Sequence, residues 1–354
     1  MCFHLLCKAI IPSMGNKATV IGSGSWGTAI ASLLAINNIS VSIYCRNNSI
    51  AEDINSHRKN SAYFPGTALP EGIQATGNLL EALNHSDTVY LVVPTKFIRS
   101  FILSKMDVWR NACSSNSLLI NCTKGLLLEP TQRTDDWLAQ TLPGPELLHL
   151  SGPNLASEIM AGLPAAAVVC GRPQAAALVQ QQLLSERFRV YTGTDMVGVE
   201  VSGFYKNILA IAAGLLTELG LGNNARAALI TRGLAEMSRL TEYFGGDPAS
   251  LSGLAGLGDL IVTCSSELSR NFQVGMRLGR GQGLAQIESE MTQVAEGVQA
   301  SRALHEWPAD HGLEGWPDLP IAEEVYSIVH CGADPRAALS RLMTRPPRSE
   351  ATRS

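Results

Sequence analysis

The stretch "KATVIGSGSWGTAIASLLAINN", residues 17–38, decides the fold expected of this chain. A β-branched run leads into Gly22, Gly24 and Gly27, spaced as G-x-G-x-x-G, and an Ala- and Leu-rich helical pattern follows. These glycines would allow, in order, a tight turn, the close approach of a pyrophosphate, and close packing of helix on strand. The spacing alone is weak evidence. Between a strand and a helix it predicts a dinucleotide-binding βαβ unit in preference to an incidental Gly-rich turn.

The end of the second expected strand, "VSIYC" (residues 41–45), indicates which dinucleotide is bound. An NAD-selective site usually places Asp or Glu there to bind the ribose hydroxyls. This chain instead has Arg46, nineteen residues after Gly27, and Glu52 and Asp53 lie too far along. Because an arginine can pair with a 2′-phosphate, Arg46 favours NADP(H) over NAD(H). The alternative is a solvated surface arginine.

The pattern of the chain changes near residue 192, and its 354 residues suffice for two domains. Before that point short β-branched runs alternate with helical patterns, which predicts a mostly parallel sheet covered by helices. After it come long helical stretches, such as 199–218 and 224–244. We therefore expect a Rossmann-type α/β domain over residues 17–192 and an all-α domain over 193–342. The strand runs are "KATVIG", "VSIYC", "DTVYLVV", "SLLINCT", "LLHLSG", "AAAVVC" and "FRVYTG".

The two ends of the chain are expected to be disordered. Residues 1–16 have an apolar start without a basic segment, so they predict a disordered leader rather than a targeting signal. A start codon placed too far upstream is the alternative, since Met14 lies just before the first strand. Residues 343–354 are rich in proline and charge, which is typical of a disordered tail.

Composition restricts the partners of this chain. A formal net charge of -4 without a Lys/Arg run argues against nucleic acid and against anionic lipid surfaces. The sequence has no run of eighteen uninterrupted apolar residues, so we expect no stable membrane insertion. The eight cysteines form no C-x-x-C pair and no metal-ligand spacing with the seven histidines, so we expect reduced thiols, no metal and a cytoplasmic location. The partner expected is a small-molecule substrate, and the sequence leaves a homodimer open.

Two polar segments in the first domain are candidates for the substrate site. In "INCTKGLLLE" (residues 120–129), Lys124 follows an apolar strand, and residues at the carboxyl ends of parallel strands face the ligand-binding edge of the sheet. In "LSGPNLASEIMAGLP" (150–164), Gly152 and Asn154 stand between a strand and a helix whose first N–H groups can face an anion. Ordinary turn chemistry would explain the glycine and proline but not the lysine.

Two further polar segments lie in the second domain. Repeated glycines in "GLAGLGDLIVTCSSELSRNFQVG" (253–275) are expected to present Asp259 on a tight loop. Ser269, Arg270 and Asn271 read as an N-cap and first helical turn, and a helix N-terminus with a guanidinium suits a phosphate monoester. A capping role alone remains the alternative for Ser269. In "QVAEGVQASRAL" (293–304), Glu296 begins a helical pattern, where it could be only a favourable acid of the first turn.

Lys206 is unusual because it lies in the apolar stretch "GVEVSGFYKNILAIAAG" (198–214), which has only one other charge, Glu200. On a helix it shares a face with Gly203, Leu209 and Ala213, so it lies on the side that packs closely. The alternative is a lysine that reaches water along its own stem. Since ketone reduction needs a proton donor and burial can bring a lysine pKa toward neutrality, Lys206 is the candidate acid.

These residues lie in long segments that resemble the bacterial NAD(P)-dependent glycerol-3-phosphate dehydrogenase family, from about residue 17 to about 340. The segments are "GSGSWGTAIA", "LSGPNLASEIMAGLP", "KNILAIAAGLLTELGLGNNARAALITRGLAEMSRL", "GLAGLGDLIVTCSSELSRN" and "VAEGVQASRAL". The resemblance implies reversible reduction of dihydroxyacetone phosphate to sn-glycerol 3-phosphate for glycerophospholipid synthesis. It also implies NADP(H) as cofactor, NAD(H) as a second one, and an active site in the cleft between a Rossmann domain and a helical domain.

The resemblance also implies roles for individual residues. Lys206 would be the catalytic proton donor and acceptor. The substrate site would comprise Lys124, Gly152, Asn154, Lys206, Asp259, Ser269, Arg270 and Asn271. The cofactor would be contacted by Ser25, Trp26, Arg46, Lys124, Ala156, Arg270, Val294 and Glu296, together with Gly22, Gly24 and Gly27 of the glycine-rich turn.

The chain departs from the family pattern in its N-terminal extension and in two other places. Asn154 stands where the family usually has Ser or Thr, although an amide can still donate a hydrogen bond. The segment "HEWPADHGLEGWPDLPIAEEVY" (305–326) is longer and richer in Pro and Trp than the usual connection. Two alternative functions share the expected fold: a β-hydroxyacid or ketopantoate-type dehydrogenase, and a non-catalytic NADP(H)-binding module.

Overall fold

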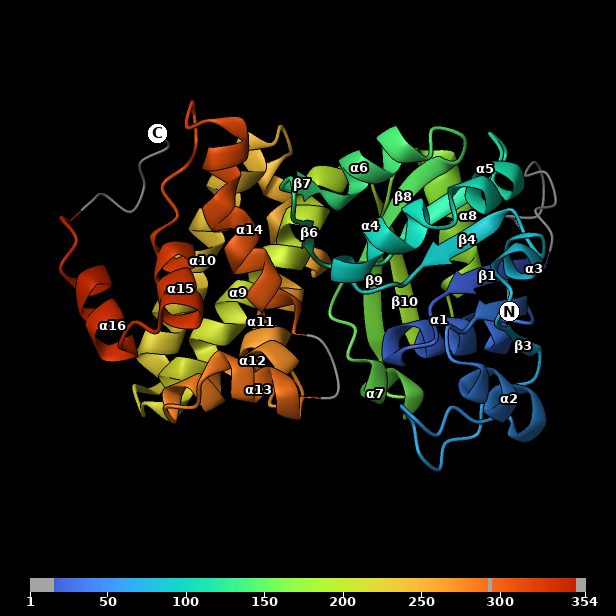
Figure 1. Cartoon of the computed structure of the whole chain (residues 1–354), viewed down its shortest axis with the longest axis horizontal. Coiled ribbons are helices and arrows are strands. Elements are labelled where there is room, and N and C mark those ends of the chain that lie inside the picture. Colours follow the sequence, from blue (N-terminus) through green and yellow to red (C-terminus); the bar gives the residue numbers. More distant parts are fainter. Residues whose placement is uncertain (1–15, 292–294, 348–354) are drawn as a thin grey trace.

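An eight-stranded sheet forms the centre of the first domain, as seen on the right of Figure 1 in the computed structural model. The structure describes residues 16–291 and 295–347. The strand order is β10-β9-β8-β5-β4-β1-β2-β3, and every neighbouring pair is parallel except β8 with β9. The mostly parallel sheet expected from the sequence is thus confirmed. The strands are β1 (Lys17–Ile21), β2 (Ser40–Tyr44), β3 (Ile73–Thr76), β4 (Thr88–Leu91), β5 (Leu118–Asn121), β8 (Glu146–Ser151), β9 (Ala165–Cys170) and β10 (Phe188–Gly193).

Helices cover both faces of this sheet (Figure 1). Successive residues of β1 point to opposite faces, so Val20 enters one hydrophobic cluster and Ile21 the other. On the first face lie α1 (Ser25–Ile36), α2 (Asn48–His57), α7 (Ala156–Met160) and α8 (Pro173–Leu183). On the second face lie α3 (Leu79–Leu83), α4 (Thr95–Leu103), α5 (Met106–Ala112) and α6 (Thr134–Thr141).

Three strands have no counterpart among the seven runs read from the sequence. β3 has the sequence "IQAT", which is short and half polar because it is the edge strand beside β2. β6 (Leu126–Leu127) and β7 (Gln132–Arg133) form a separate antiparallel hairpin of two residues each. Elements this short leave no period in a sequence.

The second domain is built around one long helix, α9 (Met196–Glu218). Its length and composition would let it span a membrane, but 89% of its most apolar window is buried inside the protein. A Cβ on Gly275 would lie 1.9 Å from the Ile211 carbonyl oxygen, so the glycine allows α12 to pack closely on α9. The other helices are α10 (Gly222–Tyr243), α11 (Asp259–Ser265), α12 (Arg270–Gly279), α13 (Leu284–Glu290), α14 (Glu296–His311), α15 (Pro320–Cys331) and α16 (Pro335–Met343), with a 3-10 turn η1 (Pro248–Ser252) and a π-helical turn η2 (Leu254–Gly258).

The expectations of disordered ends fall largely on residues 1–15 and 348–354, which lie outside the described residues. Within the described range, the Asn16 carbonyl accepts a hydrogen bond from the Ser40 N–H at the start of β2. After the last residue of α16, Met343, the Arg345 guanidinium lies 2.6 Å from Asp318 Oδ2.

Candidate active site

Two lysines from different domains meet at one buried carboxylate. Lys206 Nζ on α9 lies 2.5 Å from Asp259 Oδ1, and Lys124 Nζ, three residues beyond β5, lies 2.7 Å from Asp259 Oδ2. Lys124 also donates to the Gly152 carbonyl oxygen at 3.0 Å. The residue exposures of Lys206 and Asp259 are 5% and 2%, whereas 16% of the Lys124 side chain is exposed. Two polar segments of the first domain thus meet one polar segment of the second domain and Lys206 of α9.

The electrostatics of this trio set the protonation of Lys206. Burial lowers the pKa of Lys206 to about 8, with the attraction of Asp259 opposing the shift and the Lys124 ammonium adding to it. Burial alone would raise the pKa of Asp259, but Lys124 and Lys206 hold it below the ordinary value of a carboxyl. Asp259 therefore stays ionised, and Lys206 can gain or lose a proton near neutral pH.

The expectation that Asp259 lies on a glycine loop is wrong. The turn η2 runs directly into α11, and Asp259 is the first residue of that helix. Gly256 allows this turn to form, because a Cβ there would lie 2.0 Å from the Leu251 carbonyl oxygen. Because residues four apart share a helix face, Thr263 lies beside Asp259 and accepts a hydrogen bond from Lys206 Nζ at 2.9 Å. Sequence analysis missed Thr263, although its i+4 spacing from Asp259 could have indicated it.

Asn207, next to Lys206, connects these residues to the start of α14. The Asn207 Nδ2 donates to the Lys124 carbonyl oxygen at 3.2 Å. The Asn207 carbonyl oxygen lies so close to α14 that a Cβ on Gly297 would be 2.5 Å from it. The Gly297 N–H donates to Asn271 Oδ1 at 2.9 Å. Beside Gly297, Glu296 Oε1 accepts from both the N–H and the hydroxyl of Thr95, each at 3.2 Å. All four polar segments identified in the sequence are therefore linked by direct contacts.

The N-terminus of α12 has the cap expected from the sequence. Ser269 Oγ accepts a hydrogen bond from the Phe272 N–H at 3.3 Å. Arg270 is exposed, and its guanidinium forms no ion pair with any described residue. A free cation beside unpaired helix N–H groups suits an anion such as a phosphate.

The glycine-rich turn fits the pyrophosphate of a dinucleotide. Gly22 has φ +118°, and a Cβ on Gly27 would lie 1.8 Å from the Gly22 carbonyl oxygen. A Cβ on Gly24 would meet nothing within 4 Å, so the space in front of this residue is open. Gly24 is the N-cap of α1 and supplies no side-chain cap, which leaves the N–H groups from Ser25 onward for an anion. Trp26, the next residue, has a buried indole N–H without a partner among the described residues.

Arg46 lies just beyond the carboxyl end of β2. It is exposed two residues beyond β2, and its guanidinium lies over the Phe97 ring, 5.7 Å from the ring centroid. Lys96 Nζ lies 4.9 Å from the same centroid. Two cations thus lie near one aromatic ring at the carboxyl edge of the sheet.

The remaining predicted residues that the structure describes lie around β8. Gly152 follows β8 with φ +145°, and a Cβ there would clash with the Ala166 carbonyl oxygen at 2.9 Å. With its amide nitrogen turned toward β9, Asn154 donates to the Ala166 carbonyl oxygen at 3.1 Å. Ala156 begins α7, which packs against α1. Val294 lies outside the described residues.

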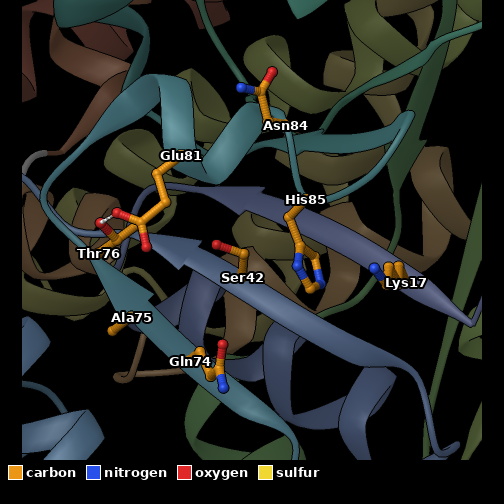
Figure 2. Close-up of a pocket in the computed structure, with 8 residues that line it drawn as sticks. All are labelled: Lys17, Ser42, Gln74, Ala75, Thr76, Glu81, Asn84 and His85. Atoms are coloured by element: carbon orange, nitrogen blue, oxygen red, sulfur yellow. Dashed lines mark hydrogen bonds between the residues drawn. The ribbon is translucent and has the colours of Figure 1, made fainter.

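A pocket of about 370 Å3, whose lining residues are drawn in Figure 2, contains none of these residues. It lies at the outer edge of the first domain, between the β1–β3 edge of the sheet and α3, and its walls include Lys17, Ser42, Glu81 and His85. The Thr76 hydroxyl donates to Glu81 Oε2 at 2.7 Å within it. This hollow is therefore separate from the lysine–aspartate cluster.

Comparison with known proteins gives one consistent family. Residues 17–177 match the model for the N-terminus of NAD-dependent glycerol-3-phosphate dehydrogenase, and residues 195–340 match the model for its C-terminus. A relative from Halothermothrix orenii named glycerol-3-phosphate dehydrogenase (NAD(P)+) is 41% identical over 338 residues, covering 95% of this chain and 97% of the relative. A Myxococcus xanthus protein of the same name is 42% identical over 335 residues, covering 94% and 98%.

A solved structure agrees with the sequence relatives. The crystal structure of glycerol-3-phosphate dehydrogenase from Coxiella burnetii superposes with a TM-score of 0.86 at 34% identity, covering 93% of this chain and 99% of that one. The resemblance inferred from the sequence is thus confirmed over both domains. The chain belongs to the NAD-dependent glycerol-3-phosphate dehydrogenase family.

Proposed function

We propose that this chain catalyses the reversible, NAD(P)H-dependent reduction of dihydroxyacetone phosphate to sn-glycerol 3-phosphate. The observation that carries the proposal is the buried Lys206–Asp259–Lys124 cluster between the two domains. It supplies a titratable ammonium, a fixed carboxylate and a partly exposed second ammonium. The same proposal takes residues 17–192 as the cofactor-binding domain and 193–342 as the domain that carries the catalytic lysine.

Lys206 is the proton donor in the direction of reduction. The carbonyl oxygen of the ketone becomes an alkoxide as C2 is reduced, and the Nζ proton of Lys206 passes to that oxygen. A pKa of about 8 suits this step, because the ammonium is populated at neutral pH and its conjugate amine can take the proton back in the reverse direction. Asp259 and Thr263 orient the Nζ through contacts of 2.5 Å and 2.9 Å.

The remaining residues of the site bind and orient the substrate. Lys124, the more exposed lysine, is placed to donate to a substrate oxygen beside Lys206. Arg270 and the N-terminus of α12 hold the phosphate, since a guanidinium and unpaired N–H groups bind phosphate oxygens well. Gly152 and Asn154 form the opposite wall. A carboxylate substrate would use this phosphate site poorly, which disfavours hydroxyacids and ketopantoate.

The dinucleotide is held by the open turn at Gly24 and by the uncapped N-terminus of α1. When bound, the nicotinamide supplies the hydride. Ser25 and Trp26 at the start of α1, Ala156 at the start of α7, and Glu296 at the start of α14 complete the proposed cofactor contacts together with Val294. Arg46 beside Phe97 would bind the 2′-phosphate, giving a preference for NADP(H).

The decisive experiment measures the oxidation of NADPH at 340 nm with dihydroxyacetone phosphate. Lys206→Ala should lower kcat by roughly 10²- to 10⁴-fold, the usual contribution of a general acid. Lys17→Ala, which removes an exposed lysine at the far end of β1, is the matched control and should leave kcat unchanged. A Lys206→Ala enzyme with near wild-type kcat would overturn the proposal, as would a wild type inactive with this substrate.

The proposal also covers the setting in which the enzyme works. A free triose phosphate is the partner, and the product would enter glycerophospholipid synthesis in the cytoplasm. The burial of α9 and the absence of disulfides among the six described cysteines support that compartment. A homodimer remains open to measurement by sedimentation of the purified chain.

A further inference from the structure

A buried polar network lies behind the Lys124 segment and is not used in the chemistry above. Asp135 Oδ1 accepts from Asn121 Nδ2 at 2.7 Å, and Asp135 Oδ2 lies 2.8 Å from His149 Nδ1. Its backbone N–H donates to Glu200 Oε1 at 2.9 Å, and Glu200 Oε2 lies 3.2 Å from the Arg133 guanidinium. All five residues are at most 8% exposed. Four come from the first domain, and Glu200 comes from α9 of the second.

Such a network is costly to bury, so it needs a structural reason. Removing an ionisable group from water costs several kcal/mol unless its partners compensate. The His149 Nε2 atom has no partner among the described residues, so the ring is held through Nδ1, which donates to Asp135 because a carboxylate only accepts. Burial and the neighbouring Asp135 raise the pKa of Glu200 well above its ordinary value, against the pull of Arg133.

The network and its neighbours hold the main chain on both sides of Lys124. Asn121 Oδ1 accepts from the Thr123 N–H at 3.1 Å and from the Thr123 hydroxyl at 2.8 Å. Thr134 Oγ1 donates to the Gly125 carbonyl oxygen at 2.8 Å. Asn207 Nδ2 donates to the Lys124 carbonyl oxygen, as described above. Each residue from 123 to 125 therefore has a main-chain group that is hydrogen-bonded to a side chain.

Asp135 determines which way the Asn121 amide faces. An amide can be turned by 180°, which exchanges its oxygen and its nitrogen. The Asp135 carboxylate accepts only, so Asn121 Nδ2 must face it and Oδ1 must face Thr123. Without that carboxylate, the turned amide would place donors opposite the Thr123 N–H, and the segment would lose its anchor.

We propose that Asp135, acting through Asn121, is a positioning residue that holds Lys124 against Asp259 and the substrate. It touches neither substrate nor cofactor. The proposal rests on the role of Lys124 in the proposed function, and it assigns the buried Asp135–His149–Glu200 group a kinetic effect as well as a structural one.

A double-mutant cycle between Asp135 and Lys124 tests this proposal. Asp135→Ala should lower kcat/KM for dihydroxyacetone phosphate about tenfold in the wild-type background, which is within the usual range for coupled neighbours. In a Lys124→Ala background the same change should cost less than about twofold, because there is no longer an ammonium to position. A purely structural role would give equal losses in both backgrounds, and that result would overturn the proposal.

Two further variants keep the test decisive if Asp135→Ala does not fold. Asp135→Asn can still accept from Asn121, and its amide can donate to His149 in the other tautomer, so kcat/KM should stay within about threefold of wild type. Thr134→Val removes only the bond to the Gly125 carbonyl and should show the same coupling to Lys124. Additive effects of Thr134→Val and Lys124→Ala would show that holding the main chain around Lys124 has no kinetic effect, and would therefore also overturn the proposal.

The matched control is Glu236→Gln, a buried carboxylate that joins α10 to the N-terminus of α15 in the second domain. It should change the midpoint of thermal unfolding without coupling to Lys124→Ala. A wild type inactive with dihydroxyacetone phosphate would overturn the proposed function and this inference together. An active wild type with equal Asp135→Ala losses in both backgrounds would overturn the inference alone.

Discussion

Replacing Asp259 by asparagine removes the negative charge that lies between two ammonium groups. The Lys206 and Lys124 nitrogens lie 2.5 Å and 2.7 Å from its two oxygens. An opposite charge at such a distance raises a lysine pKa by roughly 1–3 units, so its loss should lower the pKa of Lys206 from about 8 to roughly 6. At pH 7.5 the protonated fraction of Lys206 would then fall from about three quarters to about 3%.

The consequence depends on the direction of the reaction. Reduction of dihydroxyacetone phosphate needs the ammonium, so its kcat at pH 7.5 should fall about 20-fold, with part of the loss recovered near pH 6. Oxidation of glycerol 3-phosphate needs the neutral amine, so its kcat should fall less. The rising limb of its pH–rate profile should move about two pH units toward acid. Initial rates in both directions from pH 5.5 to 9.5 would measure this.

Asp107→Asn is the control, because it makes the same charge change on the exposed surface of α5. Equal losses of kcat in both reaction directions, with pH–rate profiles that do not shift, would refute the assignment of Asp259 as the group that raises the pKa of Lys206. Thermal unfolding of the variant should accompany the assay, because Asp259 is buried.

Three other outcomes are expected. Arg46→Asp should weaken NADPH binding at least about tenfold while changing NADH binding little, as measured by fluorescence titration; equal losses would mean that Arg46 does not bind the 2′-phosphate. Gly24→Ala should weaken both dinucleotides and leave the midpoint of thermal unfolding unchanged, because its Cβ meets no protein atom within 4 Å; a large drop in that midpoint would contradict this. Burial raises the pKa of Glu236 to about 7, so the folded state binds a proton more tightly than the unfolded chain. That stability is present below about pH 4.5 and is lost as pH rises toward 7, by up to about 3 kcal/mol. Denaturant unfolding at pH 5 and pH 7.5 should show this fall relative to Glu236→Gln, and an equal pH dependence of the two proteins would exclude it.

The parts of the fold with a clear period could be predicted from the sequence. β1 with its glycine turn, the change to helices near residue 192 and the Ser269 cap each follow from short-range patterns. Short elements could not be predicted, because β3 and the β6–β7 hairpin carry too few residues to show a period. The winding of η2 into α11 was missed for another reason: repeated glycines are as typical of a loop as of a tightly packed turn.

The site could be predicted only as separate polar segments. Each was visible because its residue type is unusual in its setting, as with Lys206 in an apolar helix. Their contacts bring together residues up to about two hundred positions apart, and no local pattern encodes such a distance. Thr263 and Asp135 were missed because threonine in a helix and aspartate in a helical first turn are ordinary there. Only their partners, Lys206 and Asn121, distinguish them.

The chemistry of Lys206 depends on both domains at once. The second domain supplies the lysine, the close packing of α9 and the carboxylate of Asp259, while the first supplies Lys124. Burial and the Lys124 ammonium both lower the pKa of Lys206. Among the groups that act on it most strongly, only Asp259 raises that pKa. Moving the first domain away would admit water and remove the second ammonium, so the pKa would return toward that of an ordinary lysine. In the proposed function, Lys206 is therefore an effective proton donor near neutral pH only while the segment at Lys124 stays in place, and the side-chain contacts to residues 123 to 125 would hold that segment there.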